Sequence, residues 1–224
     1  MICHSGVGLT PVVEGRLHHF SAGGLHNGLI LLIDDETRTY WDHITGEAVR
    51  GPLRGRRLES WAVRMTTAGA ALAGDPDLAI SRSGRGLLAR WLGGLARWQV
   101  RGRGLMPFFF HRTMEPKDRR RPTMDQGLGV VVGTRARYYP LEALRAGARA
   151  GTGAPAGLAD DWSGRRLRLF IDPADRIPAA EWEDGGRPFQ IFTRWYGFSF
   201  TYPGCEIYRG PGGGPGGAGS GTAV

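Results

Sequence analysis

The chain has 224 residues, 41% of them hydrophobic, a composition that supports an ordinary core and excludes a wholly disordered protein. Its net charge is +8, and 28 of its 29 basic residues are arginine. Two cysteines are too few for a disulfide-stapled miniprotein or a four-cysteine zinc site. No apolar run reaches the roughly 20 residues that span a bilayer. The sequence therefore predicts a folded protein without a transmembrane segment.

The first part of the chain, residues 9–60, predicts β-structure. Residues 29–33 form an apolar run of strand length, and residues 37–41 are rich in β-forming residues. The acidic triplet 34–36 lies between the two runs as a polar turn, so a hairpin is expected. Carboxylates at the tip of a hairpin are usually solvated, which favours exposed side chains here over a general acid/base site.

The next part of the chain predicts helices. Residues 61–73 are rich in alanine and end before a Gly-Asp-Pro sequence. Ser83 is a candidate N-cap for a second helix over residues 83–98, whose apolar residues form one stripe at helical spacing. Residues 106–122 predict a loop, because an aromatic run is followed there by charged residues and proline.

The C-terminal part returns to β-structure. Residues 128–132 predict a strand, Pro140 opens a short helix, and residues 166–208 have a β-like pattern. Residues 209–224 hold eight glycines and two prolines, which predicts a disordered tail. Together the segments predict a single domain over residues 1–208 of the α+β class, predominantly antiparallel β with a few short helices.

Histidines gather near the N-terminus. Five of the six lie within the first 43 residues, and Cys3 directly precedes His4. Imidazole and thiolate are ligands that zinc, copper and iron accept. Neighbours in a strand point to opposite faces, so only one of His18 and His19 can join a given site. No standard metal-binding spacing is present, which leaves a group of metal-free, partly exposed imidazoles as the alternative. The candidate ligands for a transition metal are Cys3, His4, His18 and His26.

The positive charge is concentrated in the middle of the chain. Residues 86–168 carry a net charge of +10, whereas residues 1–85 carry none and residues 169–224 carry −2. A basic stripe can bind nucleic acid or an anionic lipid surface. The use of arginine instead of lysine also follows from a GC-rich genome, which favours a solvated face over such a partner. The candidate anion-binding residues are Arg90, Arg97, Arg101, Arg119, Arg120 and Arg121.

A series of short motifs runs along the chain. Asp34-Asp35-Glu36-Thr37 is followed by Tyr40-Trp41, Thr45-Gly46-Glu47-Ala48 and Gly51-Pro52-Leu53, and later by Tyr138-Tyr139-Pro140-Leu141 and Trp195-Tyr196-Gly197-Phe198. In this order the motifs resemble the domain-of-unknown-function family DUF 3179, over about residues 3–208. The positions that carry the resemblance are Asp34, Thr37, Trp41, Gly46, Glu47, Gly51, Pro52, Tyr139, Pro140 and Trp195.

The resemblance implies no settled activity, but it indicates two departures. Many members of the family carry a C-P-L-C-G motif; Cys3 matches its first cysteine and Gly6 stands in place of the second, so a two-thiol redox pair is lost. The family's other copy of the tyrosine-proline motif, ahead of these cysteines, is missing. We therefore expect the sequence to begin inside the domain. As it stands it has no signal peptide and predicts a cytoplasmic protein; a shortened N-terminus leaves an extracytoplasmic location open.

The sequence is consistent with two functions. One is a metal- or thiol-dependent oxidoreductase with a Cys/His site near the N-terminus. The alternative is a non-catalytic binding module that uses the arginine-rich segment 90–121 for an anionic partner. In either case, we expect Trp41, Gly46 and Gly51 to serve the fold, since an indole fills a core and glycines permit tight turns.

Overall fold

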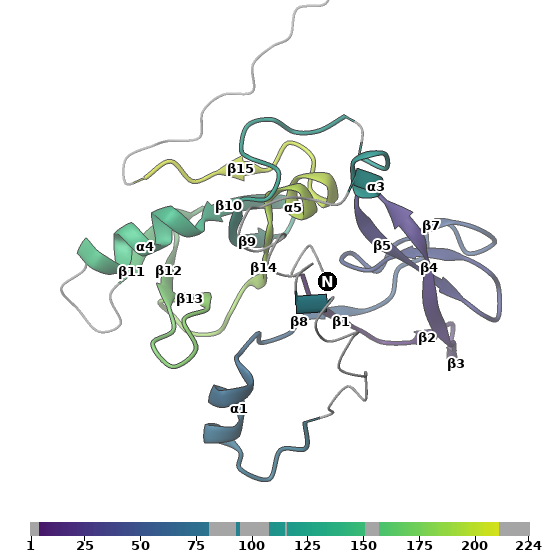
Figure 1. Cartoon of the computed structure of the whole chain (residues 1–224), viewed down its shortest axis with the longest axis horizontal. Coiled ribbons are helices and arrows are strands. Elements are labelled where there is room, and N and C mark those ends of the chain that lie inside the picture. The colour runs from purple at the N-terminus through teal and green to yellow at the C-terminus, as the bar shows by residue number, and fades with distance from the viewer. Residues whose placement is uncertain (1–4, 81–92, 95–107, 115, 151–156, 211–224) are drawn as a thin grey trace, which may run out of the picture.

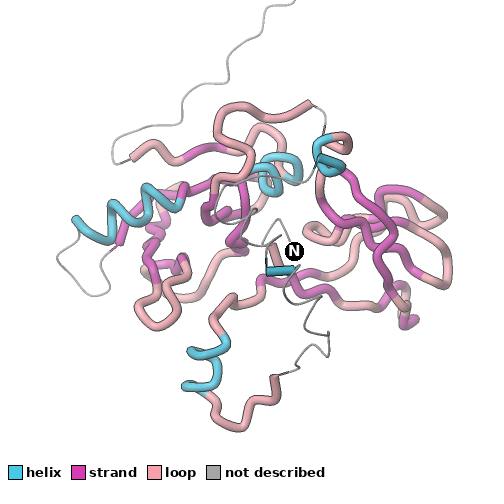
Figure 2. The backbone as a smooth tube through the Cα atoms, viewed as in Figure 1, coloured by secondary structure: helices cyan, strands magenta, loops and turns pink. Residues whose placement is uncertain are grey.

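The computed structural model describes residues 5–80, 93–94, 108–114, 116–150 and 157–210 (Figure 1). Strands predominate among them and pair mostly antiparallel, with short helices between (Figure 2). The predicted α+β class with mostly antiparallel β-structure is confirmed. The helix expected over residues 83–98 and the tail expected over residues 209–224 lie almost entirely outside the described residues.

The N-terminal part of the chain builds a four-stranded antiparallel sheet, at the right of Figure 1. Its strands, in spatial order, are β4 (Phe20–His26), β5 (Leu29–Asp34), β6 (Tyr40–Asp42) and β7 (Ala48–Arg50). Trp41, Ala48 and Leu58 are buried together with Val13 and form the core of this part. The hairpin that the sequence predicts around the acidic triplet 34–36 is therefore confirmed.

Two pairs of short strands flank this sheet. β2 (Val12–Val13) pairs with β3 (Arg16–Leu17), just before His18. β1 (Val7–Leu9) pairs with β8 (Ser60–Ala62), so the beginning of the chain is fixed to the segment that leaves the sheet. After β8 the chain runs toward the C-terminal half of the molecule.

The C-terminal half contains two further sheets. The first has the order β14 (Phe189–Arg194), β9 (Gln126–Val132), β10 (Arg135–Pro140) and β15 (Glu206–Ile207), and only β15 is parallel to its neighbour. The second is the antiparallel sheet of β11 (Gly157–Trp162), β12 (Arg165–Ile171) and β13 (Pro178–Trp182). The strand predicted over residues 128–132 lies within β9.

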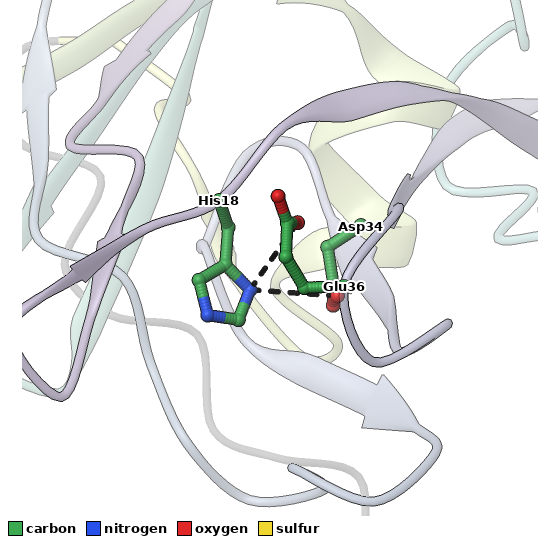
Figure 3. Close-up of side chains that lie close together, drawn as sticks. All are labelled: His18, Asp34 and Glu36. Atoms are coloured by element: carbon green, nitrogen blue, oxygen red, sulfur yellow. Dashed lines mark ion pairs between the residues drawn. The ribbon is translucent and has the colours of Figure 1, made fainter.

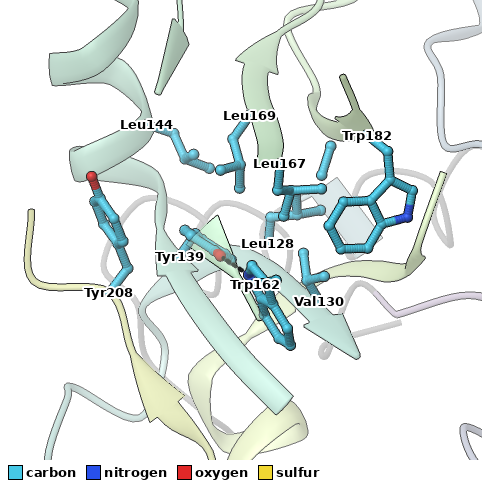
Figure 4. Close-up of a cluster of buried hydrophobic side chains, with 10 residues drawn as sticks. Leu128, Val130, Tyr139, Leu144, Trp162, Leu167, Leu169, Trp182 and Tyr208 are labelled. Carbon is cyan, nitrogen blue, oxygen red and sulfur yellow. Dashed lines mark hydrogen bonds between the residues drawn. The ribbon is translucent and has the colours of Figure 1, made fainter. Parts of the chain in front are cut away.

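Helix α4 (Leu141–Ala150) covers the core that these two sheets share (Figure 4). It begins directly after Pro140, as the sequence predicts. Leu144 of the helix packs with Leu128 of β9 and Leu169 of β12, and all three side chains are almost fully buried. Burial of each such side chain contributes about 1.5–3 kcal/mol to folding.

Three helix assignments differ from the sequence prediction. The helix expected over residues 61–73 is only α1 (Ala68–Gly74), because residues 61 and 62 pair with β1 and the hydroxyl of Thr67 caps the helix at Ala70. The loop expected over residues 106–122 contains α3 (Phe108–His111). The β-pattern expected over residues 166–208 contains α5 (Trp195–Thr201).

Helix α5 escapes prediction because it is apolar on every side. Trp195 and Phe198 pack in one buried cluster, and Tyr196 packs in another, so no amphipathic period is left in its sequence. Its first turn is fixed from outside the helix: the N–H of Trp195 donates to the carbonyl of Asp125 at 2.7 Å. The tertiary environment therefore decides the conformation of this segment.

The packing of α5 against β9 gives a first prediction. A Cβ at Gly129 would lie 2.1 Å from the ring of Phe198, which is buried and packed against Tyr138. We expect Gly129→Ala to lower the free energy of unfolding by about 1–3 kcal/mol, since a crowded core must shift. Urea denaturation followed by tryptophan fluorescence measures this change.

The matched control is Gly69→Ala, because a Cβ there meets nothing within 4 Å and Gly69 lies in α1. We expect this variant to be unchanged or stabilised by up to about 1 kcal/mol, the helix propensity difference. Equal stability of the two variants would contradict the proposed packing of Phe198 on Gly129.

Candidate functional site

The turn between β5 and β6 is organised by a buried carboxylate. Asp34 is 0% exposed, and its oxygens accept hydrogen bonds from the indole N–H of Trp41 at 2.8 Å and the backbone N–H of Thr37 at 2.6 Å. The hydroxyl of Thr37 lies 2.8 Å from the same carboxylate. The expected solvation of the acidic triplet is correct for Asp35, whose side chain is 58% exposed, and wrong for Asp34.

This hydrogen-bond network continues into the turn that follows β7. The hydroxyls of Thr37 and Thr39 are 2.7 Å apart, and the backbone N–H of Leu53 donates to the hydroxyl of Thr39. Gly51 has φ +116°, and a Cβ there would lie 2.7 Å from Thr39 Cα, so this approach requires glycine. Asp34, through two threonines, thus fixes the loop that contains Gly51 and Pro52.

The other positions of the motif around Gly46 also have structural roles. Gly46 has φ +70°, and a Cβ there would be 2.9 Å from the carbonyl oxygen of Leu58. Glu47 forms a β-bridge and an ion pair with Arg57. Trp41 is fully buried. The expectation that Trp41, Gly46 and Gly51 serve the fold agrees with these contacts.

His18 faces two carboxylates at the buried end of this turn (Figure 3). Its Nδ1 lies 3.4 Å from Oδ1 of Asp34 and 3.7 Å from Oε2 of Glu36. His18 is only 7% exposed, and among the described residues its Nδ1 has no hydrogen-bond partner. One donor atom from each of the three residues lies within 4.8 Å of the others. We call this group the His18 cluster.

The register of the β4–β5 hairpin explains why these residues meet. Phe20 lies opposite Asp34, and the N–H of Asp35 donates to the carbonyl of His19. Continued by one more position, this register places His18 opposite Glu36, and opposite residues of an antiparallel pair share a face. The bulge between Ala22 and Gly24 shifts the hairpin register by one residue and is therefore part of the site.

Hydrogen bonds from neighbouring groups fix the two carboxylates of the His18 cluster. Burial raises the pKa of Asp34, but hydrogen bonds from Trp41 and Thr37 outweigh it and hold that pKa below its usual range. The imidazole of His19, 2.7 Å from Glu36, lowers the pKa of Glu36, and Glu36 in turn raises the pKa of His19. Both carboxylates are therefore ionised at neutral pH and held in place.

Of the other predicted metal ligands, only His26 lies among the described residues, and it is not part of this cluster. Cys3 and His4 lie outside the described residues. His26 is the last residue of β4 and is exposed, and its Nε2 lies 3.3 Å from the side-chain nitrogen of Asn27. Because β4 extends by about 3.3 Å per residue, His26 is about 20 Å from the end of the strand where His18 lies. Asp34 and Glu36 had not been expected as ligands.

The described members of the arginine set have different environments. Arg120 pairs with Asp118 at 2.7 Å, and its guanidinium lies 5.3 Å from the centre of the Trp195 ring. Arg121 pairs with Asp125 and Glu142. Arg119 is exposed, and Arg90, Arg97 and Arg101 lie outside the described residues.

A second buried network surrounds the tyrosine-proline motif. Arg137 pairs with Asp160 of β11 and Glu206 of β15, while the hydroxyl of Tyr139 donates to Asp160 and accepts from the indole of Trp162 at 2.7 Å (Figure 4). Each charge in this network has an opposite charge beside it. The network therefore joins three strands through charges that are paired with one another.

These observations define a mostly antiparallel α+β protein with a buried histidine–carboxylate cluster at a hairpin turn. The family model for a protein of unknown function, DUF3179, matches residues 1–155, so the chain belongs to this family. The resemblance at Trp195 lies beyond the matched stretch. Searches of curated proteins and of solved structures returned no match. Among the described residues, no helix is long and apolar enough to cross a membrane.

The buried carboxylate gives a second prediction. Hydrogen bonds to a buried charged group contribute about 1.5–3 kcal/mol, and we expect Asp34→Asn to lower the free energy of unfolding at pH 7 by about this amount. Because folding lowers the pKa of Asp34, its contribution is complete above the unfolded pKa of about 3.9 and is lost as the pH falls through the lower folded pKa. The gap between wild type and variant should therefore narrow at pH 3.

Urea unfolding at pH 7 and at pH 3 measures this gap. The control is Asp35→Asn, which removes the same charge from the neighbouring exposed position and should change stability by less than about 0.5 kcal/mol. A gap for Asp34→Asn that is as large at pH 3 as at pH 7 would show that the carboxylate charge does not stabilise the turn.

Proposed function

We propose that this member of the DUF3179 family binds a divalent transition-metal ion through His18, Asp34 and Glu36. The observation that carries the proposal is the Nδ1 of His18: it is buried, has no hydrogen-bond partner and faces two carboxylates. A buried polar atom without a hydrogen-bond partner destabilises the fold unless a bound ion or water connects it to the neighbouring polar groups. A cation is the group that an imidazole lone pair and two carboxylates would bind together.

The distances within the cluster support an ion better than a direct hydrogen bond. The 3.4 and 3.7 Å separations exceed the usual N–H···O range of about 2.7–3.2 Å. Two ligands that each lie about 2.1 Å from one tetrahedral ion are about 3.4 Å apart. A small movement of the Glu36 side chain, which is one-third exposed, would therefore complete the coordination.

The donor set narrows the chemistry of the ion. One imidazole and two carboxylates suit zinc, iron or manganese, and three protein ligands leave positions open for water or a substrate. Oxidoreductase chemistry at this site requires iron or manganese, since the cluster contains no thiolate. The hydrogen bonds of Trp41 to Asp34 and of His19 to Glu36 are the outer contacts that orient ligating carboxylates in metal sites.

This proposal retains the metal and His18 from the sequence-based hypothesis and replaces the other predicted ligands with the two carboxylates. The anion-binding alternative has less support, because Arg120 and Arg121 are already paired with carboxylates. Arg119 alone of the described set shows no ion pair, and a single exposed arginine does not make a polyanion site.

The third prediction tests metal binding. Protein stripped with a chelator and then incubated separately with zinc, manganese or ferrous iron should retain about one equivalent of one ion by elemental analysis. That ion should raise the melting temperature. His18→Gln should abolish retention, and Glu36→Gln should weaken the affinity by about 10-fold or more. Asp34 is left unchanged in this test because its loss also destabilises the turn.

The control variant is His26→Gln, an exposed histidine at the far end of β4, which should retain the ion as the wild type does. The proposal is wrong if wild type retains no ion after incubation, or if His18→Gln retains as much as wild type. Loss of retention in His26→Gln but not in His18→Gln would favour the original Cys/His set instead.

A further inference from the structure

A pocket of about 380 Å³ lies between the segment that follows β8 and the strands β13 and β14. In Figure 1, β14 lies near the centre of the molecule, with β13 to its left and β8 to its lower right. Most of its lining is apolar and includes Leu128, Phe189 and Phe192. None of the lining residues belongs to the His18 cluster. The volume is near the lower end of the range for small-molecule sites, about 300–1,000 Å³.

One charged group of the lining forms no ion pair with the described residues. Asp175 is only 7% exposed, and one of its oxygens accepts the backbone N–H of Ile177 at 2.9 Å. Among the described residues, no cationic side chain forms an ion pair with Asp175. A buried carboxylate without a cation is costly, so this position calls for a positively charged ligand group.

A second charged group of the lining is held only loosely. The side chain of Arg64 is 64% exposed, and its one ion pair, with Asp172, is 3.5 Å long. Such exposed pairs contribute about 0–1 kcal/mol and are easily exchanged. Arg187, also in the lining, differs because two of its nitrogens hold Glu181, the nearer one at 2.6 Å. Arg64 is therefore the group that can turn to a ligand carboxylate.

We propose that this pocket binds a free α-amino acid with an apolar side chain. Asp175 would accept the ammonium group, Arg64 would exchange Asp172 for the carboxylate, and the side chain would lie on the surface of Leu128 and the two phenylalanines. A ligand with a single charge leaves one of the two groups without a partner. A purely apolar ligand leaves both groups without a partner.

The fourth prediction uses L-leucine and two analogues that each lack one charge: 3-methylbutylamine, without the carboxylate, and 4-methylpentanoate, without the amine. Calorimetric titration of the full chain should give saturable binding of L-leucine, about 10-fold or more tighter than of either analogue, since each lost charge-assisted contact costs about 1.4 kcal/mol or more.

Variants assign each charge to its residue. Asp175→Asn keeps an acceptor for Ile177 and should bind L-leucine and 4-methylpentanoate equally, while Arg64→Gln should bind L-leucine and 3-methylbutylamine equally. Arg166→Gln is the matched control, because Arg166 is an exposed arginine with a similar ion pair, to Glu183 at 3.3 Å, and does not line the pocket. It should bind all three compounds as wild type does.

The proposal is overturned if wild type shows no saturable binding of L-leucine up to about 10 mM, a concentration above the Kd of even a weak specific complex. It is also overturned if both analogues bind as tightly as L-leucine, or if Asp175→Asn and Arg64→Gln keep the discrimination of the wild type. Thermal melts of each variant, compared with Arg166→Gln, show whether a loss of binding reflects a loss of folding.

Discussion

The N-terminal half of this protein depends on the carboxylate of Asp34. Burying a charge is unfavourable by several kcal/mol unless hydrogen bonds replace its water, and here Trp41 and Thr37 supply them. The indole contact anchors the turn to the core around Trp41, and the threonine contacts extend to the loop before Leu53. Two turns of the chain therefore take their positions from one side chain.

The same carboxylate prepares the His18 cluster. Hydrogen bonds that lower the pKa of Asp34 also keep its orientation fixed, so a cation would meet an ionised ligand that needs little reorganisation. Glu36 is held less firmly, by His19 from the solvent side. The cluster thus combines one firmly held carboxylate with one that can move. The imidazole of His18 is buried beside both. The turn around Asp34 therefore contributes both to the stability of the N-terminal half and to the geometry of the His18 cluster.

The sequence is sufficient for the hairpin, for α4 and for the fold class, because their signals are local: an apolar run beside an acidic turn, and a proline before a helix. The ligand set is not local. Without the bulge at Gly23, the hairpin register would place His19, not His18, opposite Glu36. A one-residue shift of this kind cannot be predicted from the composition or from the spacing of the histidines. Helix α5 is missed for the opposite reason, since its burial on all sides removes the period that identifies helices.

In the C-terminal half, charged side chains form networks in which positive and negative groups are paired. Arg137 lies between Asp160 and Glu206, Arg121 lies between Asp125 and Glu142, and Tyr139 has both a donor and an acceptor. Within the part of the chain that the structure describes, these networks balance their own charges. His18 and Asp175 differ from these networks: the buried Nδ1 of His18 has no hydrogen-bond partner among the described residues, and buried Asp175 forms no ion pair with any of them. Because folding alone gives no advantage to such groups, each of them supports one of the two proposed binding sites.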